Sequence, residues 1–158
     1  MELIPKHNLF TSALISGGRL GQGNEESVLT PKPLTSKIGS CLAIALGADH
    51  SVFLSEQNGG SVWTCGTNSF HQLGLVPAPP MVTEPQIING SGSKLPPAAL
   101  GIGAGRFHSL FWTRSSLFTW GLNAGQLGHL KGAKTTLVPK LVTSLQQKDL
   151  QIKLVATR

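Results

Sequence analysis

Asp49, His50 and Ser51 are the residues of this sequence whose types could do catalytic chemistry, because a carboxylate, an imidazole and a hydroxyl form the relay of serine hydrolases. Their spacing excludes that relay. The three residues are consecutive at the start of an apolar run typical of a strand, and neighbours on a strand point to opposite faces. No G-x-S-x-G nucleophile motif occurs in the sequence. We therefore expect a chain that is not an enzyme.

Metal and cofactor chemistry also lack a matching pattern. Cys41 and Cys65 do not form a C-x-x-C motif, and each lies in an apolar run, so buried thiols are expected rather than a disulfide or a metal site. The glycines Gly101, Gly103 and Gly105 lack the spacing of the dinucleotide fingerprint, and no phosphate-binding G-x-x-x-x-G-K motif occurs. We expect no metal ion and no cofactor.

The composition favours one all-β domain. The 158 residues include 19 glycines and 10 prolines but only 13% charged residues, which indicates many tight turns and few solvated helices. No apolar run approaches the ~18 residues that cross a bilayer, and Pro5, Lys6 and His7 interrupt any secretory signal near the start. We expect no membrane span and a location in the cytoplasm, or else in the nucleus.

The net charge of +6 is unevenly distributed. Residues 103–158 hold eight Lys and Arg against one acid, whereas residues 1–102 hold five against six. The basic residues are spread singly, and the nearby aromatic residues lie in strand-like runs instead of alternating with them as a nucleic-acid platform would. A solvated basic face is therefore favoured over a nucleic-acid site.

Two similar units make up most of the chain. A His-Ser pair opens an apolar run at His50 and again at His108, and Gly66 and Gly121 follow a bulky residue 55 positions apart. Such a period is the signature of a repeat protein. The repeated positions are Gly47, His50, Gly66, Asn68, Gln72, Leu73 and Gly74 in the first unit, and Gly103, His108, Gly121, Asn123, Gln126, Leu127 and Gly128 in the second.

The repeated residues have structural explanations. Glycine at positions 66 and 121 allows positive φ or a close approach of neighbouring backbone. His50 and His108 begin an apolar strand, where a ring nitrogen can bond a group in an adjacent turn, and no companion ligands share their spacing. We expect these residues to hold the fold together and not to form a site.

Each unit is typical of a propeller blade, with four short strands joined by turns. In the first complete unit we expect strands over 42–46, 50–55 and 61–65 and a short outer strand around 73–76. The Asn58-Gly59 pair is a strong hairpin signal between the second and third of them. The predicted fold is an all-β partial β-propeller of about two to three four-stranded antiparallel blades.

The turn signals divide the chain into a partial first repeat over 1–40, blades over 41–98 and 99–150, and the start of a further repeat over 151–158. Both ends interrupt a unit, and stacked repeats generally need three or more units for stability. We therefore expect a fragment or a truncated isoform of a longer repeat protein.

At these positions the sequence resembles the regulator-of-chromosome-condensation repeat, which runs from Gly-x-x-His through an aromatic-x-x-Gly strand to an Asn-x-x-x-Gln-Leu-Gly turn. That resemblance implies a propeller of about seven blades. Gly105-Arg106-Phe107-His108 and the segment from Gly121 to Gly128 further resemble the repeats of adaptors in this family that restrain a tyrosine kinase. They imply a protein partner, with a Tec-family tyrosine kinase as the most concrete candidate.

Connections between strands carry the binding residues of propellers. Arg106, Arg114, Pro77 and Pro80 are the candidate partner contacts. Pro77 and Pro80 have the P-x-x-P spacing that can dock in an aromatic groove, although proline-rich connections are more common. The connection over 89–99 also differs between the units.

Two alternatives remain open. The founding member of the family implies a guanine-nucleotide exchange module for a small GTPase, for which Asp49 offers a loop acid, although the second unit has Phe107 there. The basic C-terminal part suggests chromatin or nucleic-acid binding, whose affinity would fall steeply with salt. The protein-binding interpretation is preferred to both.

Overall fold

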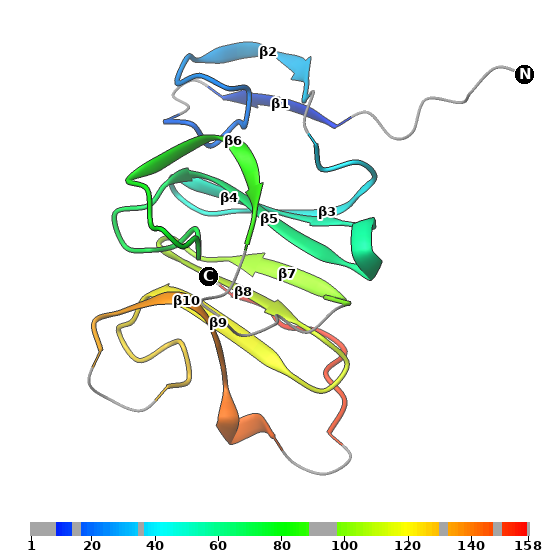
Figure 1. Ribbon diagram of the computed structural model, residues 1–158, viewed down its shortest axis with the longest axis vertical. Helices are drawn as coiled ribbons and strands as arrows, with labels where there is room; N and C mark the ends of the chain where they lie inside the picture. Colours follow the sequence, from blue (N-terminus) through cyan, green and yellow to red (C-terminus); the bar gives the residue numbers. More distant parts are fainter. Residues whose placement is uncertain are drawn as a thin grey trace, which may run out of the picture.

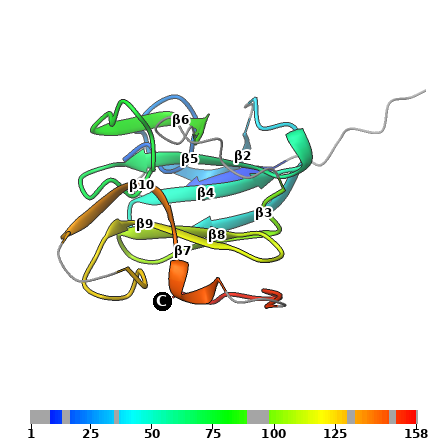
Figure 2. The ribbon, with the colours of Figure 1, turned by 60° about the horizontal axis from the view of Figure 1, so that its bottom comes forward.

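The computed structural model describes residues 9–13, 17–34, 37–88, 98–129, 133–146 and 150–157. Within them the chain forms three antiparallel sheets that follow one another along the long axis of the molecule (Figure 1). The N-terminal sheet has two strands and each of the other two has four. Figure 2 shows the two four-stranded sheets one above the other. This arrangement confirms the predicted all-β fold of antiparallel blades.

The first four-stranded sheet has the strand order β3-β4-β5-β6. Its strands are β3 (Cys41–Leu46), β4 (His50–Ser55), β5 (Ser61–Thr67) and β6 (Met81–Ile87). All six residues of β4 are buried, as expected for a central strand that pairs with a neighbour on each side and carries Val52, Phe53 and Leu54 in its middle. The short 3₁₀ turn Gln57–Gly59 joins β4 to β5, at the predicted hairpin.

The position of the fourth strand corrects the sequence prediction. The fourth strand is β6 and does not include residues 73–76. Leu73 and Leu75 belong to a turn that precedes β6, and their side chains are buried in the core. Apolar residues in an irregular connection produce the same local pattern as a short strand, and only packing separates the two.

The second four-stranded sheet repeats this topology. Its strands are β7 (Gly101–Ala104), β8 (His108–Trp112), β9 (Leu117–Leu122) and β10 (Thr135–Leu141). A 3₁₀ turn, Thr143–Leu145, follows β10. β7 packs against β3 and β4 of the first four-stranded sheet, so the innermost strands of neighbouring sheets are in contact.

The N-terminal sheet pairs β1 (Phe10–Ala13) with β2 (Val28–Pro33), the equivalents of the third and fourth strands of a blade. At the other end, the Ile152 N–H donates to the Arg114 carbonyl at 2.8 Å. The Ala99 N–H makes the same bond to the Gly60 carbonyl at 3.2 Å, just before β7 begins. The segment 150–157 therefore lies against the second blade much as the start of β7 lies against the first.

The core lies between the sheets and is mostly aromatic and aliphatic. Phe53, Phe111 and Trp120 are the largest fully buried side chains. The Phe111 and Phe118 rings stack with centroids 4.6 Å apart, and Phe111 also contacts Trp120 at 6.0 Å. Burying an aromatic side chain of this kind contributes roughly 1.5–3 kcal/mol, so these contacts stabilise the second blade, to which all three rings belong.

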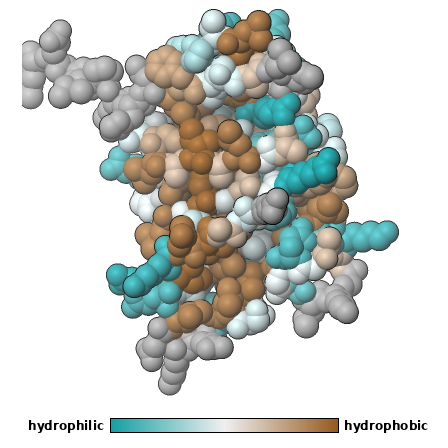
Figure 3. All heavy atoms as spheres, turned by 180° about the vertical axis from the view of Figure 1, so that it is seen from behind, coloured by the Kyte–Doolittle hydropathy of each residue, from teal (hydrophilic) through white to brown (hydrophobic). Residues whose placement is uncertain are grey.

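One strand also presents apolar side chains outward. Leu42, Ile44 and Leu46 of β3 are 59%, 42% and 71% exposed, alternating with half-buried residues that face the core. Figure 3 shows apolar atoms gathered along the middle of the face that is turned away in Figure 1. Within the described ranges, no helix is long and apolar enough to cross a membrane.

Candidate interaction surface at the loop end of the blades

The connections of each blade lie at two opposite ends. The β3–β4 and β7–β8 turns meet the long connections that follow β5 and β9, because the Thr67 N–H donates to the Asp49 carbonyl at 2.8 Å and the Leu122 N–H to the Phe107 carbonyl at 2.9 Å. We call this the loop end. The β4–β5 and β8–β9 turns lie at the other end, which we call the turn end.

A buried chain of hydrogen bonds joins the first blade (β3–β6) to the second blade (β7–β10). We call the junction between these two blades the second seam, and the junction between the N-terminal sheet and the first blade the first seam. His50 Nε2 lies 2.8 Å from Ser109 Oγ, and the Ser109 hydroxyl donates to the Gln72 carbonyl at 2.7 Å. Trp120 Nε1 donates to the same carbonyl at 2.8 Å. Because the serine proton points to Gln72, His50 Nε2–H is the donor to Ser109. Burial, reinforced by the nearby His108, lowers the pKa of His50 to about 4, so the ring is neutral at pH 7.

The same pattern recurs at the first seam, between the N-terminal sheet and the first blade. The Ser51 hydroxyl donates to the Arg19 carbonyl at 2.7 Å, and Cys65 Sγ lies 3.4 Å from that carbonyl. On the other side of the second blade, His108 Nε2 lies 2.7 Å from Thr157 Oγ1. Each strand-opening histidine thus bonds a hydroxyl of the segment that follows its blade.

The glycine before each histidine corrects one pairing made from the sequence. The Gly47 N–H donates to the His50 carbonyl and the Gly105 N–H to the His108 carbonyl, both at 2.9 Å. A Cβ on either glycine would lie within 2.4 Å of the histidine ring. The counterpart of Gly47 is therefore Gly105 and not Gly103, because two residues separate glycine from histidine in both units.

Gly66 and Gly121 have positive φ angles of 110° and 102°. A Cβ on Gly66 would lie 2.3 Å from the Asp49 carbonyl oxygen, and one on Gly121 would lie 2.6 Å from that of Phe107. No side chain fits such a contact. These glycines let the third strand pass directly beneath the turn that carries the histidine, at the loop end.

The Asn and Gln of each unit shape the long connection of the loop end. The Leu73 N–H donates to Asn68 Oδ1 at 3.0 Å and the Phe70 N–H to Gln72 Oε1 at 2.8 Å. In the second unit, Asn123 Oδ1 accepts from the Gly125 N–H at 3.0 Å and Gln126 Oε1 from the Ala124 N–H at 2.6 Å. The buried Leu73 and Leu127 anchor these turns, and Gly74 and Gly128, each with positive φ, follow them.

An aromatic–arginine cluster lies at the loop end of the second seam. The rings of Phe70 and Phe107 are tilted against each other with centroids 4.8 Å apart. The Arg106 guanidinium carbon lies 5.1 Å from the centroid of the Phe107 ring, and the Arg106 side chain is exposed. The Arg106 carbonyl accepts from the Ala48 N–H at 3.2 Å, which ties the cluster to the turn of the first blade. Phe70, Arg106 and Phe107 make up this aromatic–arginine cluster.

His71 stands beside this cluster in an uncommon backbone conformation. Its φ is 60°, whereas Gly18 and Gly125 occupy the corresponding left-handed positions of the other two units. Its Nδ1 is buried and has no hydrogen-bond partner among the described residues. Residues other than glycine are uncommon at such positions, although histidine adopts them more readily than most, and such conformations cluster at functional sites.

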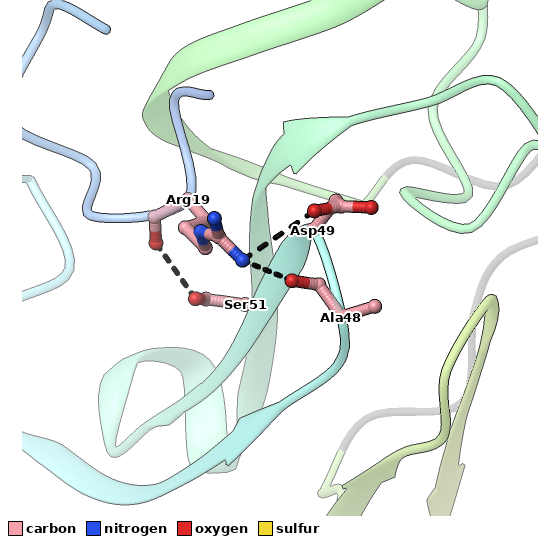
Figure 4. A network of polar contacts seen from close by, with 4 residues as sticks. All are labelled: Arg19, Ala48, Asp49 and Ser51. Atoms are coloured by element: carbon pink, nitrogen blue, oxygen red, sulfur yellow. Dashed lines mark hydrogen bonds and ion pairs between the residues drawn. The ribbon is translucent and has the colours of Figure 1, made fainter. Parts of the chain in front are cut away.

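Charges are paired at the corresponding place of the first seam. Arg19 Nη1 lies 3.4 Å from Asp49 Oδ1 and also donates to the Ala48 carbonyl (Figure 4). The Arg19 carbonyl meanwhile accepts from Ser51, so one residue joins the two sheets through both its backbone and its side chain. Within the described residues no cluster of His, Cys, Asp and Glu could hold a metal ion.

The repeats identify the family. Two models of the regulator of chromosome condensation (RCC1) repeat match the chain, one over residues 42–72 and one over residues 59–112. The inhibitors of Bruton tyrosine kinase of Homo sapiens and Mus musculus are each 40% identical to it across 98% of its residues. The chain belongs to the RCC1 repeat family. It spans 12% of the length of those two relatives.

More distant proteins are also similar to the chain, one in sequence and one in structure. The secretion-regulating guanine nucleotide exchange factor of Bos taurus is 28% identical over 91% of this chain and 31% of its own length. The crystal structure of Prp20p from Saccharomyces cerevisiae matches 89% of this chain and 35% of that chain, with a TM-score of 0.72 and 23% identity. The described sheets are thus blades of a partial RCC1 propeller.

The candidate contacts taken from the sequence lie at both ends of the RCC1 blades. Arg106, Pro77 and Pro80 belong to connections of the loop end, whereas Arg114 is exposed in the β8–β9 turn at the turn end. The structure does not bring Arg114 together with the other three. Most of the variable connection over 89–99 lies outside the described residues.

The proline segment is an ordered connection. The Pro80 carbonyl accepts from the Asn68 N–H at 2.8 Å, and the Pro79 carbonyl accepts from Asn68 Nδ2 at 2.7 Å. Pro77 and Pro79 line a cavity of about 830 Å³ beside Trp63 and β6. Asn68 therefore fixes the shape of this segment.

Phe70, His71 and Arg19 were missed by the sequence interpretation. One signal did point to the first two: three residues separate Asn68 from Gln72, but only two separate Asn123 from Gln126. The extra residue of the first unit lies in the same stretch as Phe70, whose ring contacts Phe107 of the second blade.

Proposed function

We propose that this RCC1 chain is a non-catalytic, protein-binding part of a propeller whose partner is a tyrosine kinase, Bruton tyrosine kinase being the named candidate. The observation that carries the proposal is 40% identity over 98% of the chain to inhibitors of that kinase. The chain spans 12% of those proteins, so the proposal concerns the propeller's share of the inhibitor's function. Such a partner agrees with the expected cytoplasmic location, which stays a prediction.

The architecture supports this role. Buried strands and hydrogen-bonded seams form a rigid frame, and the loop end displays side chains that differ between the blades. Binding residues in proteins lie mostly on loops held by such a frame. Arginine and aromatic residues, which occur together at the loop end, are enriched where protein interfaces derive their affinity.

The test is an isothermal titration calorimetry experiment in which the purified full chain is titrated into purified Bruton tyrosine kinase. Circular dichroism and a cooperative thermal melt first establish that the chain is folded. Saturable binding that also slows autophosphorylation of the kinase is the expected result. A folded chain that neither binds nor slows the kinase would disprove the proposal.

Nucleotide exchange on a small GTPase is the second candidate, favoured by the similarity to the secretion-regulating guanine nucleotide exchange factor. The acid considered for that role, Asp49, is half-exposed but pairs with Arg19 at 3.4 Å. An exchange function would require that ion pair to open. Accelerated release of a fluorescent guanine nucleotide from a purified GTPase, abolished by Asp49→Asn, is the result that would favour this candidate over kinase binding.

A further inference from the structure

Arg106 is a cation of the loop end that no carboxylate among the described residues neutralises. Among the described residues, the structure has one ion pair, between Arg19 and Asp49, and no carboxylate lies within ion-pair distance of Arg106. Its guanidinium instead lies over the Phe107 ring and stays exposed to solvent. At the position where the first blade has the acid Asp49, one before the histidine, the second blade has Phe107.

This geometry leaves a flat cation ready for a carboxylate. A guanidinium presents its N–H donors as a planar fork that matches a carboxylate, and a ring beneath it limits its rotation. Pre-ordering of a side chain lowers the entropy lost on binding. Phe107 in turn is held by Phe70 of the first blade, so both blades support the position of Arg106.

The charge of the chain favours the same ligand. Residues 103–158 carry eight basic residues and one acid, so this part of the chain attracts anionic segments over a longer range than Arg106 alone. A peptide fits better than a nucleic acid. Phe70 and Phe107 pack on each other and Arg106 covers Phe107, so neither ring has a free face for stacked bases, although both rings stay partly exposed and can contact a smaller apolar side chain.

We propose that the aromatic–arginine cluster binds an acidic segment of a protein partner, with the Arg106 guanidinium taking an Asp or Glu carboxylate and the Phe70–Phe107 pair an adjacent apolar side chain. This inference rests on the proposed protein-binding function and names the chemistry that the partner presents to the loop end. His71, whose buried Nδ1 lacks a partner among the described residues, borders the same site.

The experiment compares two exposed arginines at opposite ends of the second blade. A random-peptide phage library is selected on the full chain, on Arg106→Glu and on the matched control Arg114→Glu, after thermal melts establish that all three are folded. The most enriched peptide is then synthesised and titrated against each protein. Its Glu-to-Gln analogue and a single-stranded oligothymidylate serve as comparison ligands.

We expect Asp- and Glu-rich peptides to be enriched on the unmodified chain and on Arg114→Glu but not on Arg106→Glu. The synthesised peptide should bind Arg106→Glu at least about 10-fold more weakly, since a charged hydrogen-bonded pair is lost, and Arg114→Glu within about 2-fold of the unmodified chain. Phe107→Ala should weaken binding while leaving the charge unchanged, which separates the geometry of the cluster from its electrostatics.

Several outcomes would overturn the inference. Equal losses in the two arginine variants would show general attraction to a basic surface. Enrichment of neutral peptides, or no enrichment, would remove the acidic ligand. Tight, steeply salt-dependent oligothymidylate binding that depends on Arg106 would assign the site to nucleic acid. Kinase binding unaffected by Arg106→Glu refutes this inference alone, whereas a folded chain that selects acidic peptides but not the kinase refutes only the proposed kinase function.

Discussion

At the first seam the Ser51 hydroxyl donates to the Arg19 carbonyl, and at the second seam the Ser109 hydroxyl donates to the Gln72 carbonyl, both at 2.7 Å. The two seams thus share one buried hydrogen bond of the same kind. Their rims differ. The first seam is closed at the loop end by the Arg19–Asp49 ion pair, and the second by the contact of Phe70 with Phe107.

The difference follows from what each environment tolerates. A buried carbonyl must be hydrogen-bonded, so the serine recurs wherever two sheets meet. The solvent-exposed rim has no such requirement, and a charge pair and an aromatic pair both suit it. The first rim satisfies its own charges, whereas the second leaves Arg106 open to a partner. The blades therefore share a frame and differ in what they can bind.

The largest effect should come from Trp120 in the core of the second seam. Trp120 is fully buried and donates to the Gln72 carbonyl, the place that Cys65 takes at the first seam. Trp120→Ala should lower the free energy of unfolding by about 3–5 kcal/mol, the range for large cavities, and Cys65→Ala by about 1 kcal/mol. Urea unfolding measures both. Equal losses would mean that the two seams contribute alike.

The next effect is a pH dependence that arises at His50. Burial lowers the pKa of His50 from 6.5 to about 4, so between these pH values the unfolded chain binds the proton more tightly than the folded chain. The free energy of unfolding should therefore fall by about 3 kcal/mol as the pH drops through this window. Burial lowers the pKa of His108 as well and adds to the slope.

Unfolding curves between pH 4 and 7, together with a histidine ring titration by nuclear magnetic resonance, check this expectation in the unmodified chain. A ring that titrates near its ordinary value in the folded state would contradict it. His50→Gln, which keeps a hydrogen-bond donor for Ser109, should flatten the slope and leave only the part due to the other histidines.

The frame of the RCC1 blades could be predicted from the sequence, because periodic residues report local structure. The strands over 50–55 and 61–65 were predicted within two residues at either end, His50 and His108 each open a strand, and Gly66 and Gly121 each lie next to the last residue of a third strand. The outer strand was misplaced, because the apolar residues Leu73 and Leu75 are buried in the core without belonging to a strand.

The rim of the second seam could not be predicted in this way. Phe70 and Phe107 are 37 positions apart and meet only because two sheets pack against each other at one particular angle. The bond of His108 to Thr157 depends in the same way on how the segment 150–157 lies on the second blade. Neither contact leaves a periodic trace in the sequence.

A smaller effect should come from Phe107 at the rim of the second seam. Phe107→Ala removes the ring that contacts both Phe70 and Arg106, and we expect a loss of about 1–2 kcal/mol in the free energy of unfolding, largely independent of salt. Urea unfolding at low and high ionic strength measures this. A loss that disappears in salt would show that charge, and not ring packing, holds this rim together.

The smallest effect should come from Asp49 at the rim of the first seam. Asp49→Asn removes one charge of the Arg19–Asp49 pair, whose side chains are 27% and 48% exposed, so solvent screens much of the attraction. We expect a loss of about 0.5 kcal/mol or less in the free energy of unfolding at low salt, and less at 1 M salt, where the Debye length is roughly 3 Å. The Arg19 side chain keeps its bond to the Ala48 carbonyl and the Ser51 hydroxyl keeps its bond to the Arg19 carbonyl, so the buried contact between the two sheets should survive.

The matched control is Ser51→Ala, which removes the buried hydrogen bond and leaves the Arg19–Asp49 ion pair. A larger, salt-independent loss in the free energy of unfolding for this variant would establish that the buried bond is the main link of the first seam. If Asp49→Asn instead cost more than Ser51→Ala, the ion pair would be the main link of the first seam, and the two rims would differ in strength as well as in chemistry.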